Sequence, residues 1–439
     1  MPLDLDLDYI RKEWGYSRKR RTKCLARREV YQHDWYEQLR DEVLKQFLPQ
    51  NADKLLSRAD TSMNILRWAT DTIAAIYSRP VHRMIGDTLL APMAEIDLAL
   101  DLACKLTFYQ GESLVRPFWA GDRLLLDVVP ADRFLAVPDQ LDRLKLKAVV
   151  ISDTNSRGDV IGFTVWTRDE HYELNRDWTI RTPNEERANP YGVIPYVCSH
   201  AQYPSATFWH WHEAEGLHQA TLQLGVAMTD WHHLRHLQSF KQLAIRTEGA
   251  DRSKTAKLAS DPSSTLLLSG PTASAQVLDM QANLTAYLDA LLTKVESILQ
   301  LYGIKPEVAR GTEQAQSGYA LKLKLYGLQE QWEQQRQLWR LWEREMWRVA
   351  AVTVPLEGGP AIPDGSLQIT YPELGPGRDP TELSNLATQQ YSAGIVSRSE
   401  ALRMTDRSEQ QIEQIEMEIL EESAAQPSFE IPLDFEEGV

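Results

Sequence analysis

The amino-acid sequence predicts a mixed α+β fold in which helices dominate. Residues 319–352 repeat apolar side chains at steps of three and four, as one face of a single long helix requires. Residues 108–174 instead hold short segments of alternating apolar residues separated by turn sequences, a pattern typical of antiparallel strands. A chain of 439 residues also exceeds one typical core, so we expect two or more structural units.

Composition and charge narrow the classes of function. The chain is 43% hydrophobic and 25% charged, as globular proteins are, and its 13 Trp residues favour large packed or inter-subunit surfaces. The formal net charge of -15 argues against a sequence-specific DNA-binding protein with a basic face, whereas loose contact with DNA stays open.

The cysteines and the first residues bear on the compartment. Cys24, Cys104 and Cys198 are far apart and odd in number, which supports neither a disulfide framework nor a cysteine metal site and indicates a reducing compartment. The start MPLDLDLDY has no basic and then apolar stretch like that of a secretory signal, and no segment approaches about 18 uninterrupted apolar residues. We expect a cytosolic origin and no membrane-spanning helix.

The first 110 residues are predicted to be mainly helical. Residues 11–28 carry nine basic residues and one acid, which indicates a solvated helix face or arm, with contact to a polyanion as the alternative. Helices are predicted over about 29–47 and 52–78, and the second ends where Pro80 forbids its continuation. A further helix over about 88–110 leads into the strands.

The strand region begins with a predicted hairpin. Within residues 108–139, the turn Ala120-Gly121-Asp122 and the break at Pro130 separate the alternating segments. Further strands are predicted at 145–152, 160–167 and 170–174.

Two helices then enclose a small tip that contains β structure. The predicted helices cover 213–240 and 282–304, and the β-like runs QLAIRTEG and TLLLSGP lie between them, joined by the basic loop ADRSKTAKLASDPSS. Residues 305–318 show no apolar periodicity and are expected to form an exposed, mobile loop.

The long helix after this loop would span roughly 50 Å at about 1.5 Å per residue. Its apolar stripe, interrupted at Gln335, consists of Leu321, Leu325, Leu328, Trp332, Trp339, Trp342, Met346 and Val349. The three Trp residues of the stripe have two interpretations. They pack against other elements of the same chain, or they pack between identical subunits, where large aromatic residues are enriched.

The C-terminal part is predicted to be helical at first. Asp379-Pro380-Thr381-Glu382 is a good helix start, Gly394 ends that helix, and Ser397 with Glu400 caps a second one. From Ser408 onward there are ten acidic residues and no Lys or Arg, so we expect the helix to give way to disorder.

Histidine is the one residue type whose clustering in the sequence could indicate a metal site. Seven of the ten lie within residues 200–236: His200, His210, His212, His218, His232, His233 and His236. His232 and His236 share a helix face, but no Asp, Glu or Cys at a suitable spacing completes a ligand set. The motifs GxxxxGK[ST], GxGxxG and GxSxG are absent from the sequence. We therefore expect no metal, no cofactor and no enzymatic activity.

The order of these elements resembles that of the portal proteins of tailed bacteriophages, of the type with a short clip and a helical C-terminal crown. Five segments carry the resemblance: FYQGESLVRPFWAGDRLLLDVVPADRFLAVPD (108–139), NPYGVIPYV (189–197), QSGYALKLKL (316–325), ITYPELGPGRDPTE (369–382) and AGIVSRSEAL (393–402). Each segment alone is a weak signature. In this order they cover nearly the whole chain.

The resemblance implies a portal fold with a long kinked helix, assembled as a ring of typically twelve subunits. It divides the chain into a wing (1–212, with the long helix and strand at 319–378), two stem helices (213–240 and 281–304), a clip (241–280), a tunnel loop (305–318), a crown (379–423) and an acidic tail expected to be disordered (424–439). The ring would assemble in the host cytoplasm and occupy one vertex of the capsid in the virion.

The same resemblance implies partners and site residues. The ring would pass double-stranded DNA during packaging and ejection, without sequence specificity, and would bind the large terminase subunit, head-tail connector proteins, and the major capsid and scaffolding proteins, with no membrane. DNA in the channel would meet tunnel-loop residues Lys305, Arg310, Gln314 and Gln316. The clip residues that would face DNA or an acidic partner are Lys241, Arg246, Arg252, Lys254 and Lys257, with a plain solvated loop as the alternative. Subunit packing would involve Trp332, Trp339 and Trp342.

The acidic balance fits a channel through which DNA must slide. Each phosphate that a cation neutralises adds affinity through counterion release, and a ring multiplies every such contact. Two other functions stay open at this point: a helical virion scaffold without a DNA channel, and a metal-dependent hydrolase that uses the histidine cluster.

Overall fold

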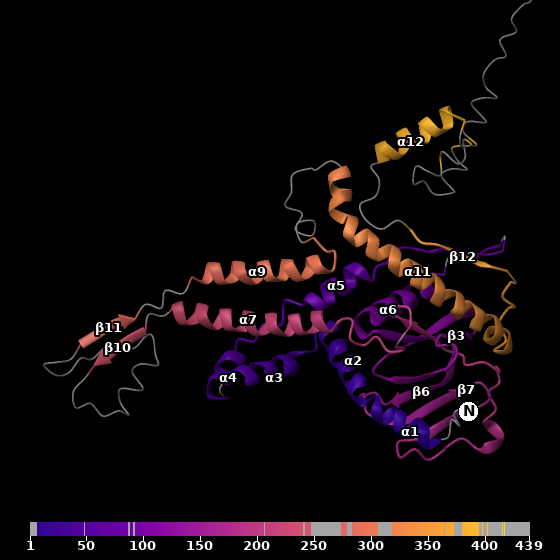
Figure 1. Ribbon diagram of the computed structural model, residues 1–439, viewed down its shortest axis with the longest axis horizontal. Helices are drawn as coiled ribbons and strands as arrows, with labels where there is room; N and C mark the ends of the chain where they lie inside the picture. The colour runs from indigo at the N-terminus through magenta and orange to yellow at the C-terminus, as the bar shows by residue number, and fades with distance from the viewer. Residues whose placement is uncertain are drawn as a thin grey trace, which may run out of the picture. The chain divides into compact units, whose positions relative to one another are not determined.

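The computed structural model describes residues 7–47, 49–86, 88–90, 93–205, 207–239, 242–246, 274–278, 283–305, 318–363, 365–372 and 380–394, with residues 397, 402, 415 and 417 (Figure 1). The chain forms two compact units, Met1–Glu313 with Lys324–Pro372 and Gln314–Leu323 with Glu373–Val439. The fold is mixed, and about half of it is helical, as the sequence predicts.

Five helices open the chain: α1 (Leu7–Tyr16), α2 (Arg18–Tyr31), α3 (Tyr36–Gln46), α4 (Pro49–Leu56) and α5 (Ile65–Ile73). The predicted helix over 29–47 is wrong, because the backbone of His33 adopts a left-handed φ of 64° and separates α2 from α3. The predicted helix over 52–78 is also two helices. The side chain of Asn64 caps α5 by accepting a hydrogen bond from the Arg67 N–H (2.9 Å), and α5 ends well before Pro80.

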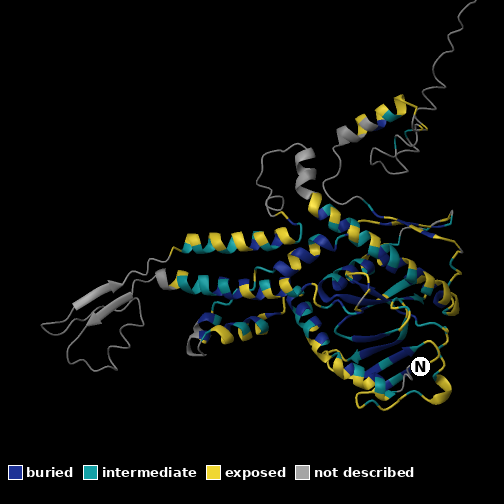
Figure 2. Cartoon of the chain, in the orientation of Figure 1, coloured by how far each residue is buried: buried dark blue, intermediate teal, exposed yellow. Residues whose placement is uncertain are grey.

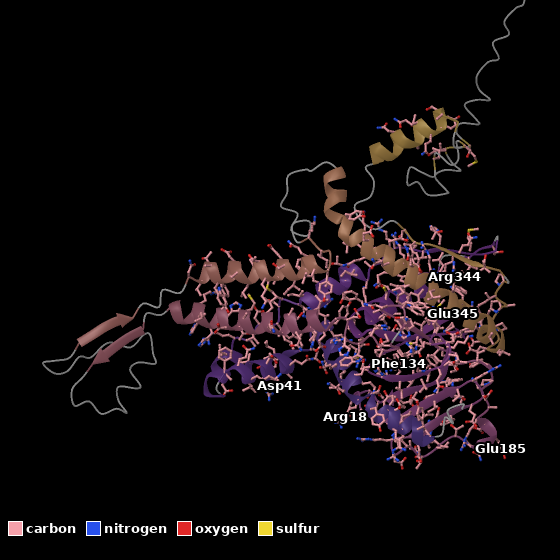
Figure 3. The ribbon with its side chains drawn as sticks, in the orientation of Figure 1. Arg18, Asp41, Phe134, Glu185, Arg344 and Glu345 are labelled. Carbon is pink, nitrogen blue, oxygen red and sulfur yellow. The ribbon has the colours of Figure 1, made fainter. Side chains whose placement is uncertain are left out.

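The basic segment 11–28 is not simply a solvated face. Arg20 and Arg27 of α2 are buried, and Arg20 donates hydrogen bonds to the carbonyl oxygens of Ala131 (3.0 Å) and Phe134 (2.7 Å). Other members of the segment, such as Arg18, are exposed (Figure 3). A guanidinium has five donors, which makes Arg suited to satisfying buried carbonyl groups.

The α/β region follows with β1 (His82–Ile85), β2 (Thr88–Leu89), α6 (Ala94–Gln110), β3 (Glu112–Ala120), β4 (Arg123–Pro130), β5 (Phe134–Pro138), β6 (Leu146–Thr154), β7 (Val160–Thr167), β8 (His171–Asn175), the 3-10 helix η1 (Asn184–Glu186) and β9 (Val197–His200). The predicted hairpin is confirmed, since Ala120 pairs with Arg123 and Gly121 has a φ of 67° in the turn. The helix predicted over 88–110 begins later, at Ala94, because residues 88–89 form β2.

All strand pairs among the described residues are antiparallel. The sheet orders are β12-β1-β2, β4-β3-β9, β5-β6-β7-β8 and β10-β11. The four-stranded sheet has apolar residues on both faces: Phe134, Val149 and Trp166 face one core with Leu114 of β3, and neighbouring residues such as Val150 face a second core with Ile10 and Trp14 of α1. Because successive strand residues point to opposite faces, both faces of this sheet are covered.

The remaining elements are α7 (Glu215–Ser239), β10 (Gln242–Arg246), β11 (Ser274–Leu278), α9 (Leu284–Leu301), α11 (Gly318–Leu356), β12 (Leu367–Thr370) and α12 (Pro380–Ser392). α7 and α9 confirm the two predicted helices, and β10 confirms the first β-like run. The strand that pairs with β10 is β11, not TLLLSGP, which lies outside the described residues.

Helix α11 confirms most of the predicted stripe. Leu328, Trp332, Trp339, Trp342 and Met346 are buried, and beyond Met346 the buried face continues through Trp347, Ala350 and Val354 instead of Val349. The side chains of Leu321 and Leu325 lie outside the described residues, and the expected kink stays a prediction. In the described part of the chain, no helix has the length and apolarity that crossing a membrane requires.

Candidate functional site

The helix pair α7 and α9 covers the two segments that were expected to be stem helices. The indole N–H of Trp231 donates to the carbonyl of Leu284 (3.2 Å) near one end, and Lys294 contacts Gln223 (3.5 Å) farther along. These contacts link late residues of α7 with early residues of α9, so the two helices run antiparallel (Figure 1). Buried Leu224 of α7 lies in the seam with Val295 of α9.

Helix α7 packs on the helices α3, α4 and α5 of the same unit, whereas α9 is largely uncovered (Figure 2). Trp35 packs directly on Gly225, where an added Cβ would lie 2.8 Å from the indole ring. The hydroxyl groups of Thr221 and Thr229 each accept a backbone N–H, from Leu66 and Asp60 respectively, at 3.0 Å. α9 leaves Leu301 82% exposed at its end.

The charges on the helix pair are mostly negative. Four carboxylates and two basic side chains occur on α7 and α9: Glu215, Asp230, Asp289 and Glu296 against Arg235 and Lys294. The two helices therefore carry no excess of basic side chains.

The start of α7 is tied to α2 by an ion-pair cluster. Glu215 accepts from Lys23 (2.8 Å) and from the buried Arg27, which also donates to the carbonyl of Trp211. Burial would raise the pKa of Glu215, but the hydrogen bonds from Lys23 and Arg27 outweigh it and lower that pKa to about 2. A carboxylate in the first turn also interacts favourably with the helix dipole.

The burial of His218, which lies one turn into α7, predicts that the stability of the fold depends on pH. Burial, reinforced by the charge of Arg27, lowers its pKa to about 4, and its ring contacts Gln38 Oε1 at 3.0 Å. Since the unfolded chain binds the proton below about pH 6.5, stability falls as the pH drops from about 6.5 to 4, by at most about 3 kcal/mol. The measurement is the urea midpoint at several pH values for the wild type and for His218→Gln, which keeps a donor for Gln38. We expect the two curves to diverge below pH 6.5, and parallel curves would contradict this role of His218.

The candidate loop and clip residues lie mostly outside the described part of the chain. Lys305 follows α9 and is exposed, and Arg246 is the last residue of β10, where its backbone pairs with Ser274. The others, Arg310, Gln314, Gln316, Lys241, Arg252, Lys254 and Lys257, are outside the described residues, as are most of 241–280 and 305–318. Their roles stay predictions.

The three Trp residues of the α11 stripe are buried against other elements of the same chain. The indole N–H of Trp332 donates to the carbonyl of Thr72 (3.0 Å), and that of Trp342 donates to the carbonyl of His200 (3.2 Å). Trp339 makes an edge contact with the ring of Tyr77. This placement matches the first interpretation of the stripe, packing within the chain, and the role in subunit packing stays a prediction.

The histidines separate into different environments. His232 contacts Asp60 (2.9 Å), and His218 contacts Gln38 (3.0 Å). His200 and His210 instead meet at a carboxylate from β3, that of Glu112. The sequence offered no local signal for Glu112, because only the pairing of β3 with β9 brings it beside His200.

Burial dominates the electrostatics of this cluster. It raises the pKa of Glu112 to about 7, although Arg20, the His210 N–H and Arg27 act in the opposite direction. Burial also lowers the pKa of His200 to about 3, helped by His210. Both effects arise because a low-dielectric interior disfavours the charged form of each group.

Comparisons with known proteins give structural matches and no sequence family. No family model matches the chain, and no curated protein matches it. One similar solved chain is from the neck of a native gene transfer agent (GTA) particle with C12 symmetry, at a TM-score of 0.43 and 13% identity over 81% of this chain and 93% of that one. A second is from the neck of an empty GTA particle with C6 symmetry, at a TM-score of 0.38 and 13% identity over 82% and 94%.

A third similar chain is from the virion of a native gene transfer agent, at a TM-score of 0.39 and 13% identity over 84% of this chain and 99% of that one. These three chains are solved structures to which this chain is similar. At this level of similarity they do not carry a function, so the proposal that follows depends on the sequence and geometry of the chain.

Proposed function

We propose that this chain is a portal protein of a tailed bacteriophage. About twelve identical subunits close into a ring at one capsid vertex, and double-stranded DNA passes through its bore during packaging and ejection. In this assignment α7 and α9 form the stem, residues 241–280 the clip, residues 305–318 the tunnel loop, and residues 379–423 the crown. The ring has no ATPase of its own and binds the large terminase subunit, connector proteins, and capsid and scaffolding proteins.

The observation that carries the proposal is the arrangement of α7, α9 and α11. α7 is anchored on the helices α3, α4 and α5, and α9 returns antiparallel to it. The 39-residue helix α11 packs through its Trp stripe against α5, Tyr77 and β9. At about 1.5 Å per residue α11 is roughly 58 Å long, so one helix can connect the loop before it to the outer part of a subunit. This is the element order that the portal resemblance implies.

Exposed apolar side chains support assembly into an oligomer. Leu98 and Leu102 lie one turn apart on α6 and are 71% and 48% exposed, and Leu301 at the end of α9 is more exposed still. Exposed apolar groups on adjacent turns cost free energy in an isolated subunit, and contact between subunits would remove them from water.

The acidic stem pair supports passage of DNA without binding. A duplex inside a ring contacts every subunit at once, so even a few cations on each subunit would together bind the DNA tightly. The excess of carboxylates on α7 and α9 keeps the attraction low, and sparse cations such as Lys305 would give transient contacts.

The purified chain tests the proposal directly. Mass photometry should give a particle near about twelve times the chain mass of 50.2 kDa, and negative-stain images should show a closed ring with a central hole that admits a B-form duplex. A filament or a solid bundle would favour a virion scaffold instead. A monomer or dimer with hydrolytic activity that depends on the histidine cluster would favour an enzyme. Either result would overturn the portal proposal.

A further inference from the structure

Three side chains from separate parts of the chain converge beneath the start of α7. Glu112 is the first residue of β3 and His200 is the last residue of β9, and the two are directly opposite in the β3-β9 register. His210 comes from the segment that leads into α7. One potential ligand atom from each of the three side chains lies within 4.8 Å of the other two.

All three side chains are buried and incompletely satisfied. Glu112 is 0%, His200 2% and His210 8% exposed. Among the described residues, no hydrogen-bond partner reaches Glu112 Oε2, Nδ1 of His200 or Nδ1 of His210. Buried polar atoms without partners are costly, so a partner that all three side chains could share would stabilise the fold.

The surrounding backbone holds these groups in place. The backbone N–H of His210 donates to Glu112 Oε1, which leaves Oε2 free to point elsewhere, and Nδ1 of His210 lies 4.0 Å from Oε1. Among the described residues, Nδ1 of His200 has no hydrogen-bond partner, so it stays available as a ligand atom.

We propose that Glu112, His200 and His210 form a binding site for a divalent first-row transition metal, with Zn²⁺ as the natural occupant. Two imidazole nitrogens and one carboxylate are a ligand set that zinc takes in proteins, at about 2.0–2.2 Å from each ligand atom, with a water molecule as the fourth ligand. Tetrahedral ligand atoms then lie about 3.3 Å apart, so each of the three would move by less than about 1 Å to close on the ion.

The site is structural in this proposal. A bound ion would join strands β3 and β9 to the segment before α7, and so would fix the start of the helix pair on the α/β region. Two cavities of about 380 and 520 Å³ in the described part of the chain are lined by other residues, so neither offers a substrate direct access to the ion. The inference does not depend on the portal proposal, since a metal link of this kind would hold the fold in any oligomeric state.

The first test uses the full wild-type chain. Metal is removed with a chelator and Co²⁺ is added as a spectroscopic probe, because tetrahedral Co²⁺ gives an intense visible absorption band. We expect one Co²⁺ per chain, displacement of the band by stoichiometric Zn²⁺, and a higher melting temperature with Zn²⁺. At a free zinc concentration of about 100 times the Kd, the unfolding equilibrium constant should fall about 100-fold.

Three variants test the ligands. Glu112→Gln, His200→Asn and His210→Asn should each lose the cobalt band and weaken zinc binding by more than about 100-fold, since even loss of an outer-shell partner costs about 10- to 100-fold. His232→Gln is the matched control, because His232 belongs to the same stretch of histidines but contacts Asp60. This control should keep the band and the zinc stoichiometry of the wild type.

Two results would overturn the site. A folded wild-type chain that binds no Co²⁺ or Zn²⁺ would mean that a water molecule bridges the three side chains. A band that persists in all three ligand variants, or that is lost in His232→Gln, would place the metal elsewhere. If a ligand variant does not fold, the wild-type stoichiometry and displacement still decide the proposal, and ring formation is scored separately by microscopy.

Discussion

Replacing Glu343 by Ala is expected to destabilise the chain by about 3–5 kcal/mol, the largest effect of a single side chain that the structure predicts. Glu343 is completely buried on α11, where it accepts hydrogen bonds from Arg83 Nε, from the Tyr77 hydroxyl (2.8 Å) and from the Trp347 indole (3.4 Å). Its removal leaves the buried Arg83 with Asp97 as its remaining ion-pair partner, at 2.7 Å.

The destabilisation by Glu343→Ala comes more from leaving the Arg83 guanidinium desolvated than from losing the attraction between Arg83 and Glu343. A buried guanidinium has given up its hydration, and the carboxylate of Glu343 is what makes this tolerable. Because Arg83 lies on β1 and Glu343 on α11, the same substitution also loosens the attachment of the long helix to β1. Glu343→Gln keeps the shape and one acceptor, and we expect a smaller loss from it.

Glu345 provides the matched control on the same helix. Its carboxylate pairs with Arg348 at 2.6 Å on the outer face of α11, where Figure 3 shows it with Arg344. Partly exposed pairs of this kind contribute about 0–1 kcal/mol, so Glu345→Ala should change stability little. The urea midpoint of each variant is the measurement. Equal midpoints for Glu343→Ala and Glu345→Ala would contradict the role of the buried carboxylate.

Replacing Gly111 by Ala is expected to cost about 3 kcal/mol or more. Gly111 ends α6 with a φ of 99°, a conformation that side-chain-bearing residues rarely adopt. An added Cβ would also lie 2.5 Å from the carbonyl carbon of His210, which is backbone and has no flexible side chain to displace. The variant should therefore move the 208–212 segment away from β3 and reduce folded yield.

Gly121→Ala separates the two causes. Gly121 has a similar left-handed φ of 67°, but an added Cβ there would meet nothing within 4 Å. Its loss should be about 1–2 kcal/mol, from backbone strain alone. The difference between the melting temperatures of the two variants then measures the steric cost of a Cβ at position 111 against the His210 backbone. If Gly111→Ala is no worse than Gly121→Ala, the packing of the 208–212 segment against β3 is not as tight as the structure indicates.

Much of the fold was predictable because its signals are local. The alternation in 160–167 gives β7 with the predicted bounds, and the predicted stripe from Leu328 to Met346 gives most of the described buried face of α11. The division between α2 and α3 was missed, since a single left-handed residue, His33, interrupts a sequence whose helical pattern continues. The partner of β10 was misplaced for a different reason: several apolar runs in 241–280 suit a strand, and only pairing selects one of them.

The sequence by itself determined the order of helices and strands, the acidic character of the helix pair and the resemblance to portal proteins, because these depend on composition and on residues a few positions apart. Tertiary structure alone decided that Arg20 and Arg27 are buried and that Glu112 lies beside His200 and His210. The physical reason is that strand register and helix docking bring together residues nearly one hundred positions apart in the chain, and no local periodicity encodes such a meeting.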